Sequence, residues 1–346
     1  MQSPSRTLRK VGAAVAALSC CAMLAASAEV SFAATPAAIH AATHSAPRSA
    51  AKSAARPAAR RAPAAYPLTL KDDTGRTVRI PHRPTRILSL TLGTDEMLLS
   101  MVSPKRIIGL DYYSTNPTYS NIVAKVKQAR IKPVGSAAGL PSAEALIKMR
   151  PDLVLTADYT NQKVVRQLQA AGIPVYEFTT FSSIAQIESH ILILGRMVGD
   201  EAKARAMVAD MNRQLAALRQ KAPKRRLTVA YYSYGDVAGR NTTVNNIIAD
   251  AGGVNAASKV NGWAQVSVEQ LLAMNPDVII VPNDSGAARA QLKQFLATRG
   301  VSALRAVREH HVYTAPDAQL SDVAQYITLG VRDVEQMLTA AARPAK

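Results

Sequence analysis

Three aspartates at or just after the ends of predicted strands are the first candidates for chemistry. Asp111, Asp158 and Asp236 each follow an apolar run, where a carboxylate can act as a general acid or base. A reaction also needs a nucleophile, a metal or a second positioned group, and none accompanies these acids in the sequence. The three aspartates therefore name no reaction by themselves.

Catalytic and metal-binding signatures are absent from the sequence. It contains no G-x-S-x-G nucleophile motif, no H-E-x-x-H zinc pair, no nucleotide-binding P-loop and no EF-hand loop. The six histidines are scattered in a way that suits no three-histidine metal site. His310 and His311 could ligate haem or a metal, although an exposed pair at the start of a strand is the simpler interpretation. We therefore predict no catalytic residues, no metal site, no cofactor and no enzymatic activity, with a secreted enzyme as the rival class.

Tyrosines gather where predicted strands end. Tyr112 and Tyr113 follow one apolar run, and Tyr231, Tyr232 and Tyr234 lie at the end of another. Ligands of open α/β sheets bind at the carboxyl ends of the strands, and aromatic faces suit a large, flat ligand. These tyrosines are therefore candidate ligand contacts.

The elements that position these residues include one unit that occurs twice. Residues 142 to 156 and 267 to 281 each predict a serine-capped helix, a proline stop and a buried strand of the kind found in parallel sheets. Any α/β protein can contain such a unit, but the shared spacing favours two similar lobes. The matching positions, all 125 residues apart, are Ser142 and Ser267, Glu144 and Glu269, Leu146 and Leu271, Met149 and Met274, Pro151 and Pro276, and Asp152 and Asp277.

The remaining pattern alternates strands and helices, which predicts right-handed parallel units. An uninterrupted helix over residues 201 to 221 would span about 30 Å, enough to cross between two lobes. We predict an N-terminal lobe at 66–200, an interdomain helix at 201–221 and a C-terminal lobe at 222–346. Other expected elements are a hairpin at 66–80, strands at 86–90, 107–110, 175–178, 227–232 and 311–314, and helices at 95–102, 161–171, 183–198, 245–251, 287–297 and 321–341.

The N-terminal region predicts export. Residues 1–33 combine basic residues, an apolar run and small-residue cleavage sites, as in a secretory signal peptide. Both cysteines, Cys20 and Cys21, lie within this segment. Signal-peptide cleavage is the favoured interpretation, and a lipid anchor at Cys21 is the less favoured alternative. Residues 34–65 are rich in Ala, Pro and basic residues and predict a disordered tether. The formal net charge of +18 favours anionic partners without identifying one.

Several stretches together resemble the periplasmic binding proteins for cobalamin and ferric siderophores, which serve ABC importers. The resemblance runs from about Tyr66 to about Ala341 and rests on RPTRILSL, TDEMLLSM, IIGL, the paired Ser-x-Glu…Pro-Asp repeats, the long helix and VNNIIADAGGVN. It implies an α/β fold of two similar Rossmann-like lobes with mainly parallel sheets, joined by one long rigid helix, with the ligand in a cleft between the lobes. It also implies that Glu144 and Glu269 meet arginines of an ABC permease dimer. An exposed residue near a helix N-terminus is the simpler interpretation of each glutamate.

The resemblance also proposes ligand contacts. Trp263 stands before the second glutamate where cobalamin-binding members have a Trp, and Tyr113 stands where they have a Tyr. Ala138 departs from the pattern, because those members carry a second Trp there, so ferric siderophores and haem remain alternatives. Arg240 would favour an anionic chelate. The candidate ligand-binding residues are Tyr112, Tyr113, Tyr159, Tyr232, Tyr234, Arg240 and Trp263.

The sequence thus predicts a periplasmic, monomeric substrate-binding component of an ABC importer. We expect it to capture cobalamin or a related metal chelate, to deliver it to an inner-membrane permease and to bind no nucleic acid. A polyanion-binding surface protein that acts through the tether is a third possibility. Deleting residues 34 to 65 would abolish partner binding only in that case.

Overall fold

The computed structural model describes residues 65–179, 181–283 and 288–343. The predicted signal peptide, both cysteines and all of the predicted tether except Ala65 lie outside these residues. Within them, no helix has the length and apolar character needed to cross a membrane.

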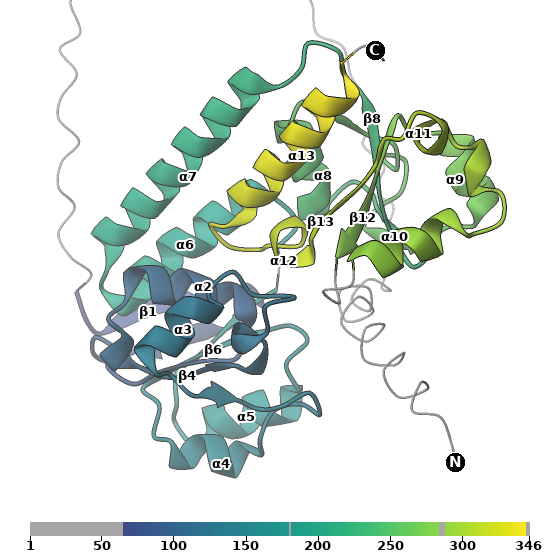
Figure 1. Ribbon diagram of the computed structural model, residues 1–346. Coiled ribbons are helices and arrows are strands. Elements are labelled where there is room, and N and C mark those ends of the chain that lie inside the picture. Colours follow the sequence, from purple (N-terminus) through teal and green to yellow (C-terminus); the bar gives the residue numbers. More distant parts are fainter. Residues whose placement is uncertain (1–64, 180, 284–287, 344–346) are drawn as a thin grey trace, which may run out of the picture.

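The first sheet contains five parallel strands in the order β5-β4-β3-β6-β7 (Figure 1). Strands β3, β6 and β7 are buried at every position, because helices cover both faces of the sheet. The strands are β3 (Ile87–Ser89), β4 (Ile107–Asp111), β5 (Pro133–Val134), β6 (Leu153–Ala157) and β7 (Val175–Phe178).

An antiparallel hairpin of β1 (Leu68–Lys71) and β2 (Thr77–Ile80) precedes this sheet, as predicted. In its turn, Asp72 Oδ1 accepts hydrogen bonds from the backbone N–H groups of Thr74 (3.0 Å) and Arg76 (2.9 Å). The helices of this half are α2 (Leu92–Met101), α3 (Val123–Ala129), α4 (Ala143–Lys148), α5 (Gln162–Ala170) and α6 (Ile184–Val198), with short 3₁₀ turns η2 (Pro104–Arg106) and η3 (Tyr112–Thr115).

The second sheet has the order β11-β9-β8-β12-β13, and β10 also pairs with β8. Its parallel strands are β8 (Thr228–Ser233), β10 (Val254–Asn255), β12 (Val278–Asn283) and β13 (Val312–Pro316). Strand β9 (Asp236–Ala238) pairs antiparallel with β8, and β11 (Trp263–Gln265) pairs antiparallel with β9 at the edge of the sheet. The helices are α8 (Thr243–Asp250), α9 (Val268–Met274), α10 (Ala288–Leu296), α11 (Arg305–Arg308), α12 (Asp317–Leu320) and α13 (Ile327–Ala341), with the 3₁₀ turn η4 (Val301–Ala303).

The repeated unit forms α4 and β6 in the first half and α9 and β12 in the second, as predicted. The hydroxyls of Ser142 and Ser267 cap the two helices by accepting from backbone N–H groups at 3.3 and 3.2 Å. The repeated aspartates also have equivalent partners. Asp152 accepts from the N–H of Thr85 (2.7 Å), ahead of β3, and Asp277 from that of Thr228 (2.8 Å), at the start of β8. Each aspartate thereby ties its strand to the neighbouring central strand.

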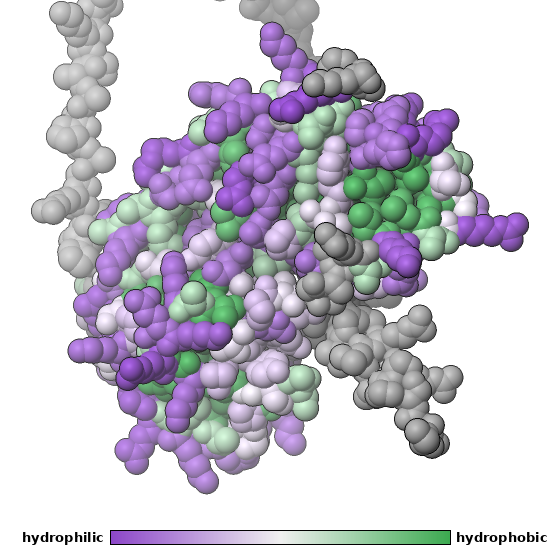
Figure 2. All heavy atoms as spheres, in the orientation of Figure 1, coloured by the Kyte–Doolittle hydropathy of each residue, from purple (hydrophilic) through white to green (hydrophobic). Residues whose placement is uncertain are grey.

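Helix α7 (Glu201–Lys221) matches its predicted range and lies in sequence between the two sheets. Figure 1 shows α7 beside α6 and α13, running from the first half of the molecule toward the second. It buries Ala204, Met211 and Leu215 in a core cluster that includes residues of both halves. In Figure 2 hydrophilic side chains cover the outer surface of α7 and α13, whereas hydrophobic residues gather over α10 and α11.

One expectation about the second half was wrong, and two of its strands were not predicted. The predicted helix at 321–341 begins only at Ile327, because residues 321 to 326 leave the helical path between α12 and α13. Asp322 interrupts it by accepting from the N–H of Ala324 (2.8 Å), a local bond that competes with helix formation. The antiparallel strands β9 and β11 were also not predicted, since each is only three residues long.

Candidate functional site

The strand order of the first sheet reverses between β3 and β6, where open α/β sheets bind ligands. Thr91 follows β3 and Tyr159 follows β6, and their hydroxyl oxygens are 2.6 Å apart. The Tyr159 residue is 51% exposed overall, so its ring reaches solvent while its hydroxyl is held against Thr91. Burial of that hydroxyl, together with nearby carboxylates, raises the pKa of Tyr159.

A buried polar group lies beneath this point. Asp95 is completely buried; one carboxyl oxygen accepts from the N–H of Asp111 (2.8 Å), and the other has no partner among the described residues. Burial, and then the charge of Asp111, raise the pKa of Asp95 well above its ordinary value. The Asp111 carboxylate accepts from the N–H of Tyr113 (2.8 Å) and thereby positions the turn η3. Burial also raises the pKa of Asp111.

Turn η3 presents a tyrosine cluster next to this carboxyl end. Tyr112 and Tyr113 make an edge-to-face contact with ring centroids 5.5 Å apart, and Tyr113 makes a second one with Tyr119, also at 5.5 Å. All three rings are partly exposed. Burial, followed by the charge of Asp111, raises the pKa of Tyr113.

In the second sheet the order of the parallel strands reverses between β8 and β12. Tyr234 follows β8 in the turn to β9 and is 60% exposed. Its φ of 50° places its backbone in the left-handed region, which is uncommon for a residue other than glycine. Its hydroxyl accepts from Nε2 of Gln291 in α10 (3.0 Å). Tyr234 thus follows β8 and Tyr159 follows β6, and each of these strands adjoins the point where the strand order of its sheet reverses.

The other predicted ligand residues of the second half lie differently. Side chains alternate along β8, so Tyr231 and Tyr232 point to opposite faces of the sheet. Tyr232 packs against Phe295 of α10 (centroids 5.2 Å apart). Trp263 is half-buried and makes an edge-to-face contact with Tyr231 (5.3 Å). Arg240 is exposed and lies two residues beyond β9, which runs away from the Tyr234 turn.

The two predicted docking glutamates lie in equivalent first turns, Glu144 in α4 and Glu269 in α9. Both side chains are exposed. Hydrogen bonds at the helix N-termini lower the pKa of each: chiefly its own backbone N–H for Glu144 and the capping Ser267 for Glu269. Both glutamates are therefore anionic at neutral pH, and both carboxylates are accessible to a partner protein.

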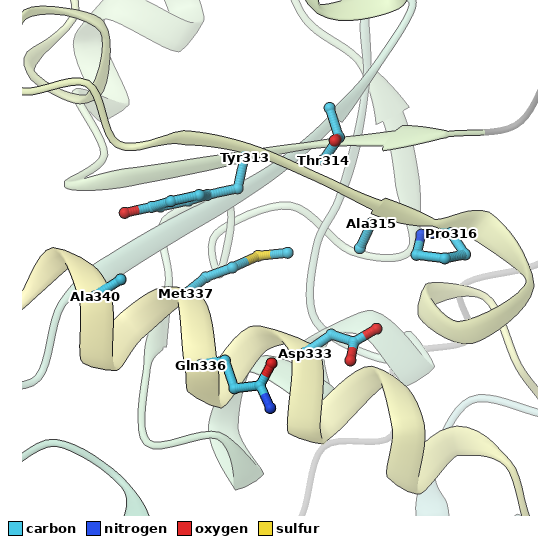
Figure 3. A pocket seen from close by; sticks show the side chains of 8 residues that line it. All are labelled: Tyr313, Thr314, Ala315, Pro316, Asp333, Gln336, Met337 and Ala340. Atoms are coloured by element: carbon cyan, nitrogen blue, oxygen red, sulfur yellow. The ribbon is translucent and has the colours of Figure 1, made fainter. Parts of the chain in front are cut away.

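Two cavities lie away from these residues. One, of about 370 Å³, separates β13 from α13, and Figure 3 shows Tyr313 and Met337 among the side chains that line it. The other, of about 330 Å³, lies in the loop that contains Ala138, between β5 and α4. No group of three metal-ligating side chains occurs in the described residues. His311, a candidate ligand in the sequence, stacks on Tyr313 with ring centroids 6.4 Å apart.

Sequence reasoning missed the residues that support the exposed tyrosines: Thr91, Asp95 and Gln291. Thr91 had a usable signal, since it directly follows the apolar run at 86–90, where ligand edges occur. Asp95 had none, because a carboxylate in the first turn of a helix is ordinarily an exposed group that favours the helix dipole.

Comparisons with known proteins place the chain in context. The family model described as "Periplasmic binding protein" matches residues 87–319. The chain is 25% identical over 284 residues to the uncharacterized ABC transporter substrate-binding lipoprotein YvrC of Bacillus subtilis, covering 79% of this chain and 86% of that protein. It is 28% identical over 225 residues to a cobalamin-binding protein of Halobacterium salinarum, covering 62% of this chain and only 58% of that protein.

The fold is similar to that of solved structures. One of these is the apo form of a periplasmic heme-binding protein, RhuT, from Roseiflexus sp. RS-1. The comparison has a TM-score of 0.65 at 24% identity and covers 75% of this chain and 99% of that chain. At this identity the likeness establishes the α/β fold with two mainly parallel sheets.

Proposed function

The chain belongs to the periplasmic binding protein family, and we propose that it serves an ABC importer as the extracytoplasmic component that captures cobalamin or a related metal chelate. The family consists of binding proteins and not of enzymes, in agreement with the absence of catalytic signatures in the sequence. The B. subtilis relative is named as a substrate-binding lipoprotein of an ABC transporter, which supports the transport role.

The location of the proposed site rests on two exposed tyrosines. Tyr159 and Tyr234 follow central strands of the two sheets and are both more than half exposed. Each hydroxyl is held by a partner of its own half, Thr91 or Gln291, which positions two tyrosines that remain more than half exposed. We propose that the ligand binds in a cleft between the two lobes and contacts both rings, with Tyr112, Tyr113 and Trp263 as further contacts.

We propose the lobe boundaries 66–200 and 222–346, with α7 as a rigid connection. The 21-residue helix buries one face against the shared core, which supports rigidity. The cleft would then be largely preformed, and closure would be a small motion. Small-angle X-ray scattering with and without ligand tests this: a large domain rotation would contradict a rigid connection.

Cobalamin is the first ligand choice because a relative is named as cobalamin-binding, and the position of Trp263 agrees with that resemblance. Ala138 weighs against it, because cobalamin-binding members carry a Trp at that position. The solved heme-binding protein keeps haem as a second candidate, with ferric siderophores as a third. Tyr232 and Arg240 are the weakest ligand candidates, because one packs on α10 and the other lies beyond β9.

We propose that Glu144 and Glu269 dock the protein onto the permease dimer. Their equivalent positions, exposure and negative charge support this role, because an exposed carboxylate can pair with an arginine of the partner. We also propose that residues 1–33 act as a signal peptide and that the chain acts as a monomer. Mass spectrometry of the secreted protein would distinguish signal cleavage from lipidation at Cys21.

Isothermal titration calorimetry with cyanocobalamin, haem and ferric siderophores tests the proposed function. We expect saturable binding of at least one chelate, and a loss of at least about tenfold in affinity in a Tyr159→Ala, Tyr234→Ala double variant. A Tyr313→Ala variant in the cavity between β13 and α13 is the control. Absence of binding to every chelate would contradict the proposal.

A further inference from the structure

The three aspartates for which the sequence offered no reaction all lie near the proposed ligand edge. Asp111 ends β4, Asp158 directly follows β6, and Asp236 opens β9 after the Tyr234 turn. Asp158 is exposed, and the other two are partly exposed. Both sheets therefore present carboxylates at the carboxyl ends of their central strands.

In the first sheet these charges converge on one tyrosine. Asp158 directly precedes Tyr159, and the Asp111 carboxylate accepts from the N–H of Tyr113 (2.8 Å) at the end of β4. The charges of Asp111 and Asp158 both contribute to the raised pKa of Tyr159. The same Asp111 charge raises the pKa of Tyr113. Every charge that shifts these two phenols is negative. The ring of Tyr159 thus reaches solvent from an acidic surrounding.

In the second sheet Asp236 has the corresponding effect. Its charge adds to burial in raising the pKa of Tyr232, and burial alone raises the pKa of Asp236 itself. Asp236 pairs with Ser233 directly beside the Tyr234 turn of the hairpin, whereas Arg240 is four residues farther along the chain. Four residues of extended chain span about 13 Å, so Arg240 lies well away from the Tyr234 turn.

We propose that this edge selects ligands by charge and favours neutral or cationic chelates, with hydrogen-bond donors at their periphery, over anionic ones. The inference rests on the proposed function and narrows its ligand class. Carboxylates accept hydrogen bonds from amide N–H₂ groups and attract cations, but they repel a chelate that is itself negatively charged. A corrin decorated with primary amides and a cationic ferric hydroxamate fit this edge. A ferric tris-catecholate, which is trianionic, does not.

The choice of variants follows from the hydrogen bonds. Asp111 is unsuitable, because its carboxylate also holds the N–H of Tyr113. Asp158 and Asp236 can each be changed to Asn with little change in volume. Asp210→Asn is the matched control. Asp210 is an exposed carboxylate that pairs with Arg213 (2.7 Å), and both residues lie on α7 and not at the end of a strand.

The test is calorimetric titration of the purified protein with cyanocobalamin, a cationic linear ferric hydroxamate and a ferric tris-catecholate, at low and high salt. We expect the cyanocobalamin or hydroxamate complex to be at least about 100-fold tighter than the tris-catecholate complex. The Asp158→Asn, Asp236→Asn double variant should bind the tris-catecholate about tenfold more tightly, most clearly at low salt, where screening is weakest. The Asp210→Asn variant should bind all three chelates as the wild type does.

Three results would overturn the inference, and they differ in whether chelate capture is retained. If the tris-catecholate binds as tightly as the other chelates, or if the double variant gains no affinity for it, charge selection is wrong while chelate capture is retained. If no chelate binds, the proposed function fails and the inference fails with it.

Discussion

A buried carboxyl pair joins the first half of the molecule to its C-terminal segment, and its removal gives a sharp prediction. Glu96 of α2 is 2% exposed and Asp322, between α12 and α13, is 5% exposed. Asn121 connects them: its N–H donates to Glu96 Oε1 (2.8 Å) and its side-chain amide donates to Asp322 Oδ2 (3.0 Å). Burial raises the pKa of both carboxyls, and the Asp322 charge raises that of Glu96 further.

The direction of the pH effect follows from these shifts. Because both pKa values are higher in the folded chain than in the unfolded chain, the folded state holds extra protons above pH 4.5, the ordinary value for Glu. The free energy of unfolding therefore falls as the pH rises from that value through the folded pKa. Each extra proton bound by the folded state lowers the free energy of unfolding by about 1.4 kcal/mol for every unit that the pH rises.

Glu96→Gln should remove one of these protons while it keeps the local geometry. The amide oxygen can still accept from the N–H of Asn121, and the amide nitrogen can donate to Asp322 in place of the carboxyl proton. Between the ordinary pKa of Glu96 and its raised pKa in the folded chain, we expect the free energy of unfolding of the variant to fall less steeply than that of the wild type, by up to about 1.4 kcal/mol per pH unit. At pH 8 the variant should be the more stable protein.

Urea denaturation followed by circular dichroism at pH 5, 6, 7 and 8 measures this difference. Lys125 faces the same segment, donating to the hydroxyl of Tyr326 (2.6 Å), so salt should be held constant across the series. Asp210→Asn, at an exposed position on α7 where the carboxylate pairs with Arg213 (2.7 Å), is the control and should leave the slope unchanged. Parallel pH profiles for the wild type and Glu96→Gln would refute the reasoning.

Three further predictions concern docking, the site and the connecting helix. Reversing both charges in Glu144→Arg, Glu269→Arg should leave chelate affinity within about twofold and reduce transporter-dependent uptake in cells at least about tenfold; unchanged uptake would remove these glutamates from the interface. Tyr159→Phe should lower chelate affinity less than Tyr159→Ala, because the ring remains although the hydroxyl that contacts Thr91 is lost; equal losses in titrations would assign the contact to the hydroxyl instead. Leu215→Ala should destabilise the protein by about 2–5 kcal/mol, since Leu215 is fully buried in the core shared by both halves, whereas exposed Leu296→Ala should cost much less; similar melting temperatures for the two variants would contradict the packing of α7.

Local sequence signals predicted most of the helices and strands. The serine caps and the Pro-Asp steps of the repeat predicted α4, β6, α9 and β12, because helix caps and buried strands depend on nearby residues. The interruption before α13 could not be predicted, since no Gly or Pro marks it. Asp322 breaks the helix through a bond to Ala324 and faces Asn121, about 200 positions away in the chain.

The site was predictable in outline only. The apolar runs predicted that Tyr113, Tyr159 and Tyr234 follow strands, but sequence could not tell that Tyr232 packs on Phe295 or that Trp263 packs on Tyr231. The support of Tyr159 by Thr91 joins residues from two strands, 68 positions apart. Such contacts depend on which strands are neighbours in the sheet, and this order is not a local property of the sequence.

The most direct test of the central claim locates the metal of a bound chelate. Crystals of the complex, measured at the absorption edge of cobalt or iron, give an anomalous peak that marks the metal position. We predict a single peak between the carboxyl ends of the two sheets, with the chelate in contact with both Tyr159 and Tyr234. A peak in the cavity between β13 and α13, or a chelate that touches only one sheet, would contradict a binding site shared by the two lobes.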